Sequence, residues 1–168
     1  MDDIHPTDAI SVDRESAVAR GDKLELRVWL RLLTCASLIE TRVRAGLREA
    51  FGVTLPRFDV LAQLDRAADG LSMGELSDRL MVSNGNVTGL VDRLAEEGLI
   101  SRTPSVSDRR QSRVALTPAG KRAFDAMTPQ HERWIDDMFA GLSRAEMAQM
   151  LELLGKLKQS VGRMGAKS

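Results

Sequence analysis

The sequence predicts a mainly α-helical protein that carries one small β-hairpin. Apolar residues recur at helical spacing over most of the 168 residues, and typical helix-starting and helix-ending residues separate these stripes. Two short runs, 99–103 and 113–116, break this period and are typical of strands. The apolar stripes near the two ends of the chain are longer than the segment between them can cover, which indicates association with another chain.

Two helices are expected before the middle of the chain. The first begins at Asp22, which has a glutamate three residues later as in a capping box, and ends at Gly52. Its apolar residues repeat at helical spacing, and we expect Cys35 to be buried among them. The second helix follows Thr54 and ends by Gly70.

A pair of short helices comes next, followed by the hairpin. Ser72 and Glu75 form a Ser-x-x-Glu capping box that opens the third helix. After a brief turn, Ser83 caps a fourth helix, whose apolar stripe lies within 87–94. The two strands then flank the polar stretch 104–112, and this order is that of a winged helix-turn-helix domain.

Two further helices complete the chain. Thr117 and Pro118 restart a helix over 119–140, with the threonine as its cap and the proline in its first turn. A second Ser-x-x-Glu box, at Ser143, begins the last helix, which has a long apolar stripe. We expect the first and last helices to build a dimerisation layer.

The exposed face of the fourth helix has the chemistry to read DNA. It is centred on Gly85, Gly89 and Asp92, opposite the apolar stripe. Two exposed glycines cost roughly 1 kcal/mol each relative to alanine, which we interpret as room for the backbone to approach a groove. The polar side chains beside them suit base edges and phosphates. The DNA-contacting residues predicted on this helix are Ser83, Asn84, Gly85, Asn86, Thr88, Gly89 and Arg93.

The hairpin concentrates positive charge. Six basic residues and one acid lie between Ser101 and Arg122, a net charge of +5 in a chain whose formal net charge is zero. Such charge suits phosphate contacts and insertion into the minor groove, although a solvated basic loop is the alternative. We expect Asp108 to hold one neighbouring arginine while the other enters the groove. The predicted contacts here are Asp108, Arg109, Arg110 and Arg113.

Four segments follow from this interpretation. Residues 1–21 have five acids against two arginines and few apolar groups, so we expect an acidic, flexible tail. Residues 22–52 form a dimerisation helix, 53–118 form the winged helix-turn-helix lobe, and 119–168 form the C-terminal dimerisation helices.

Residues 56–120 resemble the MarR family of bacterial transcriptional regulators. The resemblance rests on 87–94 (VTGLVDRL), 98–100 (GLI), Arg102, 108–110 (DRR) and 116–120 (LTPAG). It implies a homodimer on a pseudo-palindromic double-stranded operator, with recognition helices in successive major grooves and wings in the flanking minor grooves. It also implies a repressor that releases DNA when a small aromatic ligand binds.

A narrower resemblance, carried by 29–35, 54–59 and 81–89, is to the branch that senses hydroxycinnamoyl-CoA thioesters in aromatic-acid catabolism. It implies p-coumaroyl-CoA or feruloyl-CoA as ligand. The family's ligand site lies where the dimerisation helices meet the DNA-binding lobe, which implies an apolar slot for an aryl group with arginines for a carboxylate or CoA phosphates. The ligand-binding residues expected are Trp29, Arg31, Leu33, Arg57, Phe58, Leu61, His131 and Trp134.

Other functions remain as alternatives. The ligand could instead be a free phenolic acid, or the regulator could respond to oxidation of Cys35. A third interpretation is a purely structural helical dimer that binds no DNA. We expect no enzyme, cofactor or metal site, because the two histidines are His5 and His131 and no Cys/His cluster has ligand spacing. No apolar run is long enough to span a membrane, and the single cysteine suits a cytoplasmic protein.

Overall fold

The computed structural model describes residues 23–82, 84–104 and 112–165. The chain divides into two compact units, Met1–His131 and Glu132–Ser168. The expected tail and Asp22 lie outside the described residues, as do Ser83 and the wing-tip residues 105–111. Within the described ranges, no helix combines the length and the apolarity that a membrane span requires.

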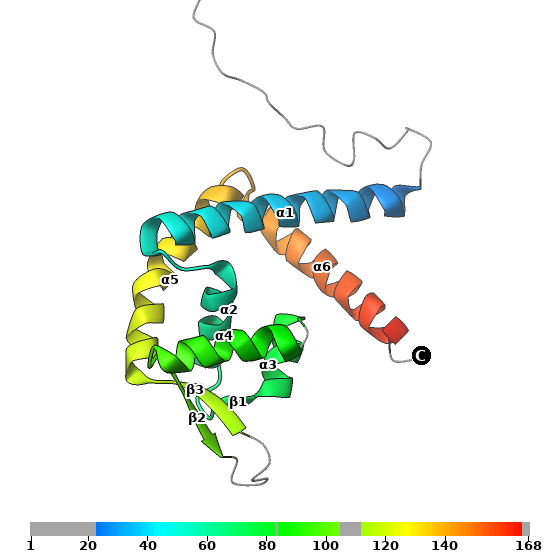
Figure 1. Ribbon diagram of the computed structural model, residues 1–168. Helices are drawn as coiled ribbons and strands as arrows, with labels where there is room; N and C mark the ends of the chain where they lie inside the picture. Colours follow the sequence, from blue (N-terminus) through cyan, green and yellow to red (C-terminus); the bar gives the residue numbers. More distant parts are fainter. Residues whose placement is uncertain (1–22, 83, 105–111, 166–168) are drawn as a thin grey trace, which may run out of the picture. The chain divides into compact units, whose positions relative to one another are not determined.

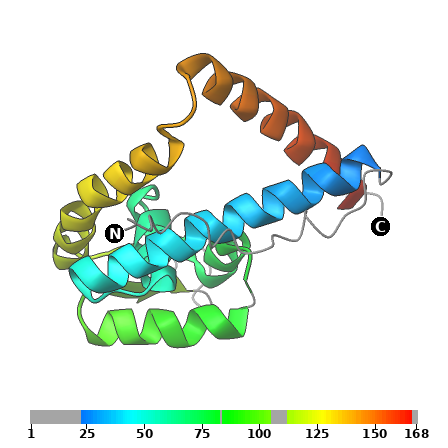
Figure 2. The ribbon, with the colours of Figure 1, turned by 90° about the horizontal axis from the view of Figure 1, so that it is seen from above.

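The described elements follow the predicted order with one addition. The first unit holds the winged helix-turn-helix elements and the start of α5, and the second unit holds the rest of α5 and all of α6. Figures 1 and 2 show α4 at the surface of the first unit in both views. The elements are α1 (Leu24–Phe51), α2 (Leu55–Asp65), β1 (Leu71–Ser72), α3 (Met73–Leu80), α4 (Asn84–Glu96), β2 (Ile100–Pro104), β3 (Ser112–Leu116), α5 (Pro118–Phe139) and α6 (Arg144–Gly165).

The ends of the first two helices test the cap predictions. At the start of α1 the N-cap is Lys23, whose side chain makes no cap hydrogen bond, so the cap predicted at Asp22 was wrong by one residue, although the helix begins near it. Gly52 ends α1 in the left-handed conformation, with its N–H donating to the carbonyl of Arg48, as expected. The second helix stops at Asp65, earlier than the predicted limit at Gly70.

The sheet has a third strand that the sequence did not predict. The strand order is β1-β3-β2, all antiparallel, and the two residues of β1 pair with Val114 and Arg113 of β3. The preceding Gly70 has φ +73°, and a Cβ there would lie 2.6 Å from the carbonyl oxygen of Val114. A glycine is therefore required where the chain enters this short strand.

The predicted capping signals position the helix pair and α5. Ser72 accepts a hydrogen bond from the N–H of Glu75, and the glutamate accepts one from the N–H of Ser72. Thr117 accepts from the N–H of Gly120 at 3.0 Å and donates to the carbonyl of Gly98 at 2.7 Å. The start of α5 is thus tied to the end of α4.

The core of the first unit comes from α1 to α5 and the sheet. Val87, Val91 and Leu94 of the predicted α4 stripe are buried, which fixes the opposite face toward the outside. Fully buried side chains from the other elements surround them: Leu47, Val60, Leu61, Leu64, Leu76 and Val114.

Candidate nucleic-acid interface

The outer face of α4 carries the residues that the sequence predicts to contact DNA. Gly85, Asn86 and Thr88 are exposed. Among the described residues, a Cβ added at Gly85 or Gly89 would meet nothing within 4 Å, so no packing seen there requires these glycines. Ser83 lies outside the described residues, and Asn84 is the first residue of α4. This arrangement leaves a narrow, smooth helix face of the kind that can approach a groove wall closely.

An ion pair joins the β-hairpin to helix α4. An Nη2 of Arg102 on β2 lies 2.6 Å from an Oδ1 of Asp92 on α4. Arg93, the next residue on α4, donates from Nε to the carbonyl of Gly89 at 3.1 Å, so its side chain lies back along the helix. Arg102 therefore orients the hairpin relative to the helix rather than adding only positive charge.

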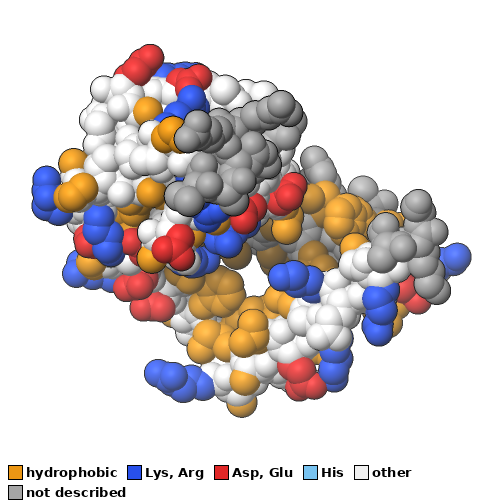
Figure 3. Space-filling model, turned by 90° about the horizontal axis from the view of Figure 1, so that it is seen from below, with side chains coloured by type: hydrophobic (Ala, Val, Ile, Leu, Met, Phe, Trp, Pro, Cys, Tyr) orange, Lys and Arg blue, Asp and Glu red, His pale blue; other side chains and the backbone are white. Residues whose placement is uncertain are grey.

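Much of the hairpin's charge has local partners. Arg113 donates from Nε to the carbonyl of Asp69 at 2.9 Å and from Nη2 to that of Gly70 at 2.6 Å. Lys121 forms ion pairs with Asp65, at 3.0 Å, and with Asp125, which raise its pKa. In Figure 3, blue basic and red acidic side chains alternate over the face seen from below. Asp108, Arg109 and Arg110, the predicted minor-groove contacts, lie outside the described residues.

A hollow of about 540 Å³ adjoins the face of α4 that is predicted to contact DNA. Burial raises the pKa of Asp59 in its wall, and repulsion from Glu40 raises it further. Glu40 itself pairs with Arg44 one turn along α1. The lining residues come from α1, the start of α2, and the α3–α4 pair: Glu40, Arg44, Thr54, Leu55, Pro56, Asp59, Leu80, Val82, Asn86, Val87, Leu90 and Arg93.

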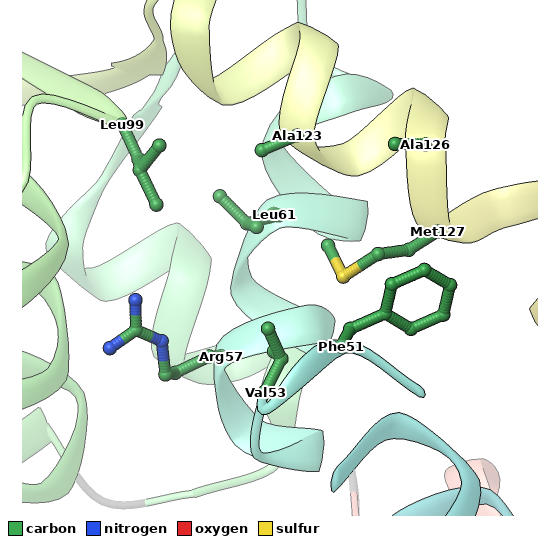
Figure 4. A pocket seen from close by; sticks show the side chains of 8 residues that line it. All are labelled: Phe51, Val53, Arg57, Leu61, Leu99, Ala123, Ala126 and Met127. Atoms are coloured by element: carbon green, nitrogen blue, oxygen red, sulfur yellow. The ribbon is translucent and has the colours of Figure 1, made fainter. Parts of the chain in front are cut away.

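A smaller cavity of about 190 Å³ lies between α2, α5 and the α4–β2 junction (Figure 4). At its edge the guanidinium of Arg57 binds both carboxylate oxygens of Glu97, with Nη1 to Oε1 at 2.7 Å. This hydrogen-bonded pairing raises the pKa of Arg57 and lowers that of Glu97. The lining residues are Phe51, Val53, Arg57, Leu61, Leu99, Ala123, Ala126 and Met127.

The residues expected to bind a ligand fall into different environments. Phe58 is buried, and its ring stacks on His131 with centroids 4.6 Å apart and lies 5.4 Å from the ring of Phe124. Leu61 and Arg57 line the smaller cavity. On α1, Trp29 is 57% exposed and Arg31 is exposed, whereas Leu33 is half-buried. Trp134 belongs to the second unit. None of these residues lines the larger hollow.

Cys35 does not lie in a core. The structure leaves it exposed on α1, so the expected burial was wrong. The physical reason is that the buried residues of α1 are Val43 and Leu47, near its C-terminal end, whereas the part around Cys35 packs against little of its own chain.

Comparison with known proteins identifies the chain. A model of the MarR family matches residues 51–111. The transcriptional activatory protein BadR of Rhodopseudomonas palustris is 32% identical over 152 residues, covering 87% of this chain and 86% of BadR. The chain belongs to the MarR family. It is a DNA-binding transcriptional regulator with the winged helix-turn-helix fold that the sequence predicted.

Solved MarR structures agree with this assignment. A MarR family transcriptional regulator from Silicibacter pomeroyi is 34% identical, with a TM-score of 0.69 over 82% of this chain and 94% of that one. CouR from Rhodococcus jostii RHA1, solved with p-coumaroyl-CoA bound, is 24% identical, with a TM-score of 0.70 over 81% of this chain and 94% of CouR. The second likeness supports the fold alone.

Two features of this MarR protein were missed by reasoning from the sequence. The pairing of Glu97 with Arg57 was not predicted, because the two residues lie 40 positions apart in the sequence. Asp59 and Glu40 of the larger hollow were not singled out, because nothing local in the sequence shows that a carboxylate on an amphipathic helix will line a hollow.

Proposed function

We propose that this chain is a homodimeric, ligand-responsive repressor of aromatic-acid catabolism genes, released from a pseudo-palindromic operator by a hydroxycinnamoyl-CoA thioester. The observation that carries the proposal is the larger hollow, because the same helix α4 forms part of its wall and presents the DNA-reading face. A ligand in that hollow contacts Asn86 and Arg93, two residues predicted to meet bases. Ligand and DNA therefore compete for the same side chains.

DNA reading is assigned to the exposed face of α4 and to the wing. Asn86 has the amide geometry that pairs with adenine, and Thr88 offers a methyl group to thymine. Arg109 and Arg110 are proposed to enter the flanking minor grooves, with Asp108 holding one of them. Because these contacts neutralise phosphates, DNA affinity should fall steeply with added salt.

A second copy of the chain is the proposed partner of the terminal helices. Monomeric globular proteins rarely expose large apolar patches, and here the exposed large side chains concentrate on α1 and α6. In α6, Leu151 is 75% exposed and Val161 is 60% exposed. The other exposed large apolar residues of the two helices are Leu24, Leu26, Val28, Trp29, Leu38, Leu153, Leu154 and Leu157.

The chemistry of the larger hollow suits a hydroxylated aryl group. Its volume of about 540 Å³ falls in the usual range for small-molecule sites. The partly desolvated carboxylate of Asp59 accepts a hydrogen bond from a phenolic hydroxyl, which compensates for its burial. Arg44 and Arg93 are the cations of the same lining, and we assign them to the thioester oxygen and the CoA phosphates. CouR, a structural neighbour, was solved with p-coumaroyl-CoA bound, and this supports the choice of ligand.

The test is fluorescence anisotropy on a labelled fragment of the promoter of the protein's own gene. We expect p-coumaroyl-CoA to release the DNA, while free p-coumarate and free CoA at equal concentration leave it bound. Release by the free acid alone would replace the thioester by the phenolic acid as ligand. The absence of binding at low salt would refute the DNA-binding assignment itself.

Matched variants separate the parts of the proposal. Asp59→Ala should keep operator affinity and lose the response to p-coumaroyl-CoA, whereas Asp69→Ala, an exposed aspartate outside the lining, should keep both.

Replacing Leu151 and Val161 together by glutamate should give monomers in analytical ultracentrifugation without loss of helicity, since both side chains are already exposed. Glu152→Gln on the same helix is the control that stays dimeric. A Leu151/Val161 variant that stays dimeric would refute the role of α6.

A further inference from the structure

We propose that Arg113 is a positioning residue, which holds the wing in place by fastening β3 to the turn that precedes α3, and that it makes no contact with DNA phosphates. This role differs from the direct DNA contact that the charge of Arg113 predicts. The hold itself does not depend on the proposed function. Its effect on operator affinity does, because it requires that the wing contact DNA as proposed above.

The side chain of Arg113 is bound to the backbone of that turn. Its Nε donates to the carbonyl of Asp69 at 2.9 Å, and its Nη2 donates to the carbonyl of Gly70 at 2.6 Å. These two donors form one edge of the planar guanidinium, whose fixed fork fits two neighbouring acceptors at once. Both acceptors are backbone atoms, so they cannot turn away as a side chain can. Arg113 therefore links β3 to the turn at two points.

The turn and the start of α3 pack closely on β3. Gly70 is buried, and the next residue, Leu71, pairs with β3. The carboxylate of Glu75, in the first turn of α3, lies near the guanidinium of Arg113. Hydrogen bonds from Ser72 lower the pKa of Glu75, and the charge of Arg113 lowers it further. The hold thus joins the central strand of the sheet to the first helix of the helix-turn-helix pair.

Arg113 lies near the outer end of the described hairpin. It pairs with Thr103 of β2, and of the described pairs that of Pro104 with Ser112 alone lies farther out. On β2, the neighbouring Arg102 forms the ion pair with α4 described above. The hairpin is thus held through both of its strands, β2 to α4 and β3 to the turn before α3. Two holds at this level fix the direction in which the wing leaves the domain.

Arg113→Lys and Arg113→Gln together separate a hold from a phosphate contact. Arg113→Lys keeps the positive charge, but one ammonium group lacks the fork that binds both carbonyls. We therefore expect both variants to lose operator affinity to the same extent, by about five- to tenfold. The slope of log affinity against log salt should keep its wild-type value, because no phosphate contact is lost. A phosphate contact predicts instead that Arg113→Lys binds like the wild type and that Arg113→Gln reduces the slope by about 0.9.

Fluorescence anisotropy of the full-length protein over a series of salt concentrations gives these affinities. The probe is a labelled duplex that the wild-type protein enriches from a random-sequence pool. Arg122→Lys is the matched control, because Arg122 is an exposed arginine on α5, and this variant should bind as the wild type does. Wild-type affinity of Arg113→Lys, or a reduced slope for Arg113→Gln, overturns the proposal.

Hydrogen–deuterium exchange of the DNA-free protein tests the hold without DNA. In Arg113→Lys the amides of residues 69–72 and 112–116 should exchange faster, while those of α1 keep their wild-type rates and show that the variant is folded. Unchanged exchange in these two segments overturns the proposal. The two proposals fail separately. Absence of wild-type binding to any duplex at low salt removes the proposed function, and the exchange rates still confirm or overturn the hold.

Discussion

Gly89→Ala separates the stability of α4 from its use in DNA binding. A Cβ at this position meets nothing within 4 Å in the part of the chain that the structure describes, so the substitution introduces no clash there. Alanine is a better helix former than glycine, and we expect the free energy of unfolding to rise by about 0.5–1 kcal/mol. If the glycine allows the helix backbone to approach a groove wall, the added methyl group overpacks that contact, which typically costs about 1–3 kcal/mol. Operator affinity should then fall at least tenfold.

Two measurements on the Gly89→Ala protein show whether the glycine is kept for DNA binding at a cost in stability. Urea denaturation followed by circular dichroism gives the change in stability, and anisotropy on the operator fragment gives the change in affinity. Gly74→Ala is the matched control, because Gly74 is also a helical glycine with no described atom near its Cβ position, and it lies on α3. The control should gain stability and keep its affinity. A Gly89→Ala protein that binds DNA as well as wild type would refute the reason given for a glycine there.

Three further predictions follow from the same contacts. Gly120→Ala should destabilise the protein by about 1–3 kcal/mol in urea denaturation despite alanine's helix propensity, because its Cβ would lie 1.9 Å from the carbonyl oxygen of Leu99; a neutral effect would contradict the packing described. Asp92→Asn, which weakens the ion pair with Arg102, should reduce operator affinity severalfold with little change in melting temperature, whereas unchanged affinity would show that this pair does not orient the wing. Asp59→Asn should stabilise the protein at neutral pH. The pKa of Asp59 is raised in the folded state, so its ionisation costs stability as pH rises from about 4 through that pKa. The gain in stability of Asp59→Asn over the wild type should therefore vanish below about pH 4. A gain in stability that does not depend on pH would exclude the charge as its cause.

Local signals in the sequence were sufficient for the helices and the hairpin. The Ser72–Glu75 box, the cap at Thr117 and the apolar stripe of α4 each depend on residues within one or two turns, and the structure has them as predicted. Strand β1 was missed because two residues carry no periodicity, and its residue Ser72 had already been assigned as a helix cap.

Features that join distant parts of the chain could not be predicted in the same way. Arg113 was expected to contact DNA on the basis of charge, yet its side chain donates to backbone carbonyls about 44 residues earlier. Backbone carbonyls are present at every residue, so nothing in the sequence marks these two as acceptors. The exposure of Cys35 depends in the same way on which part of α1 packs against the rest of its chain.

Helix α5 is the chain's only covalent connection between its two compact units, and its backbone is weakened close to their boundary. The units meet in sequence at His131 and Glu132, and Pro129 lies within the same helix just before them. A proline has no N–H to donate, so the carbonyl four residues earlier lacks its helical partner at that point. Bending of α5 therefore costs least near the boundary. In a dimer held together through α6, this compliance would let each DNA-binding lobe adjust separately, so that operators with slightly different half-site spacings are tolerated.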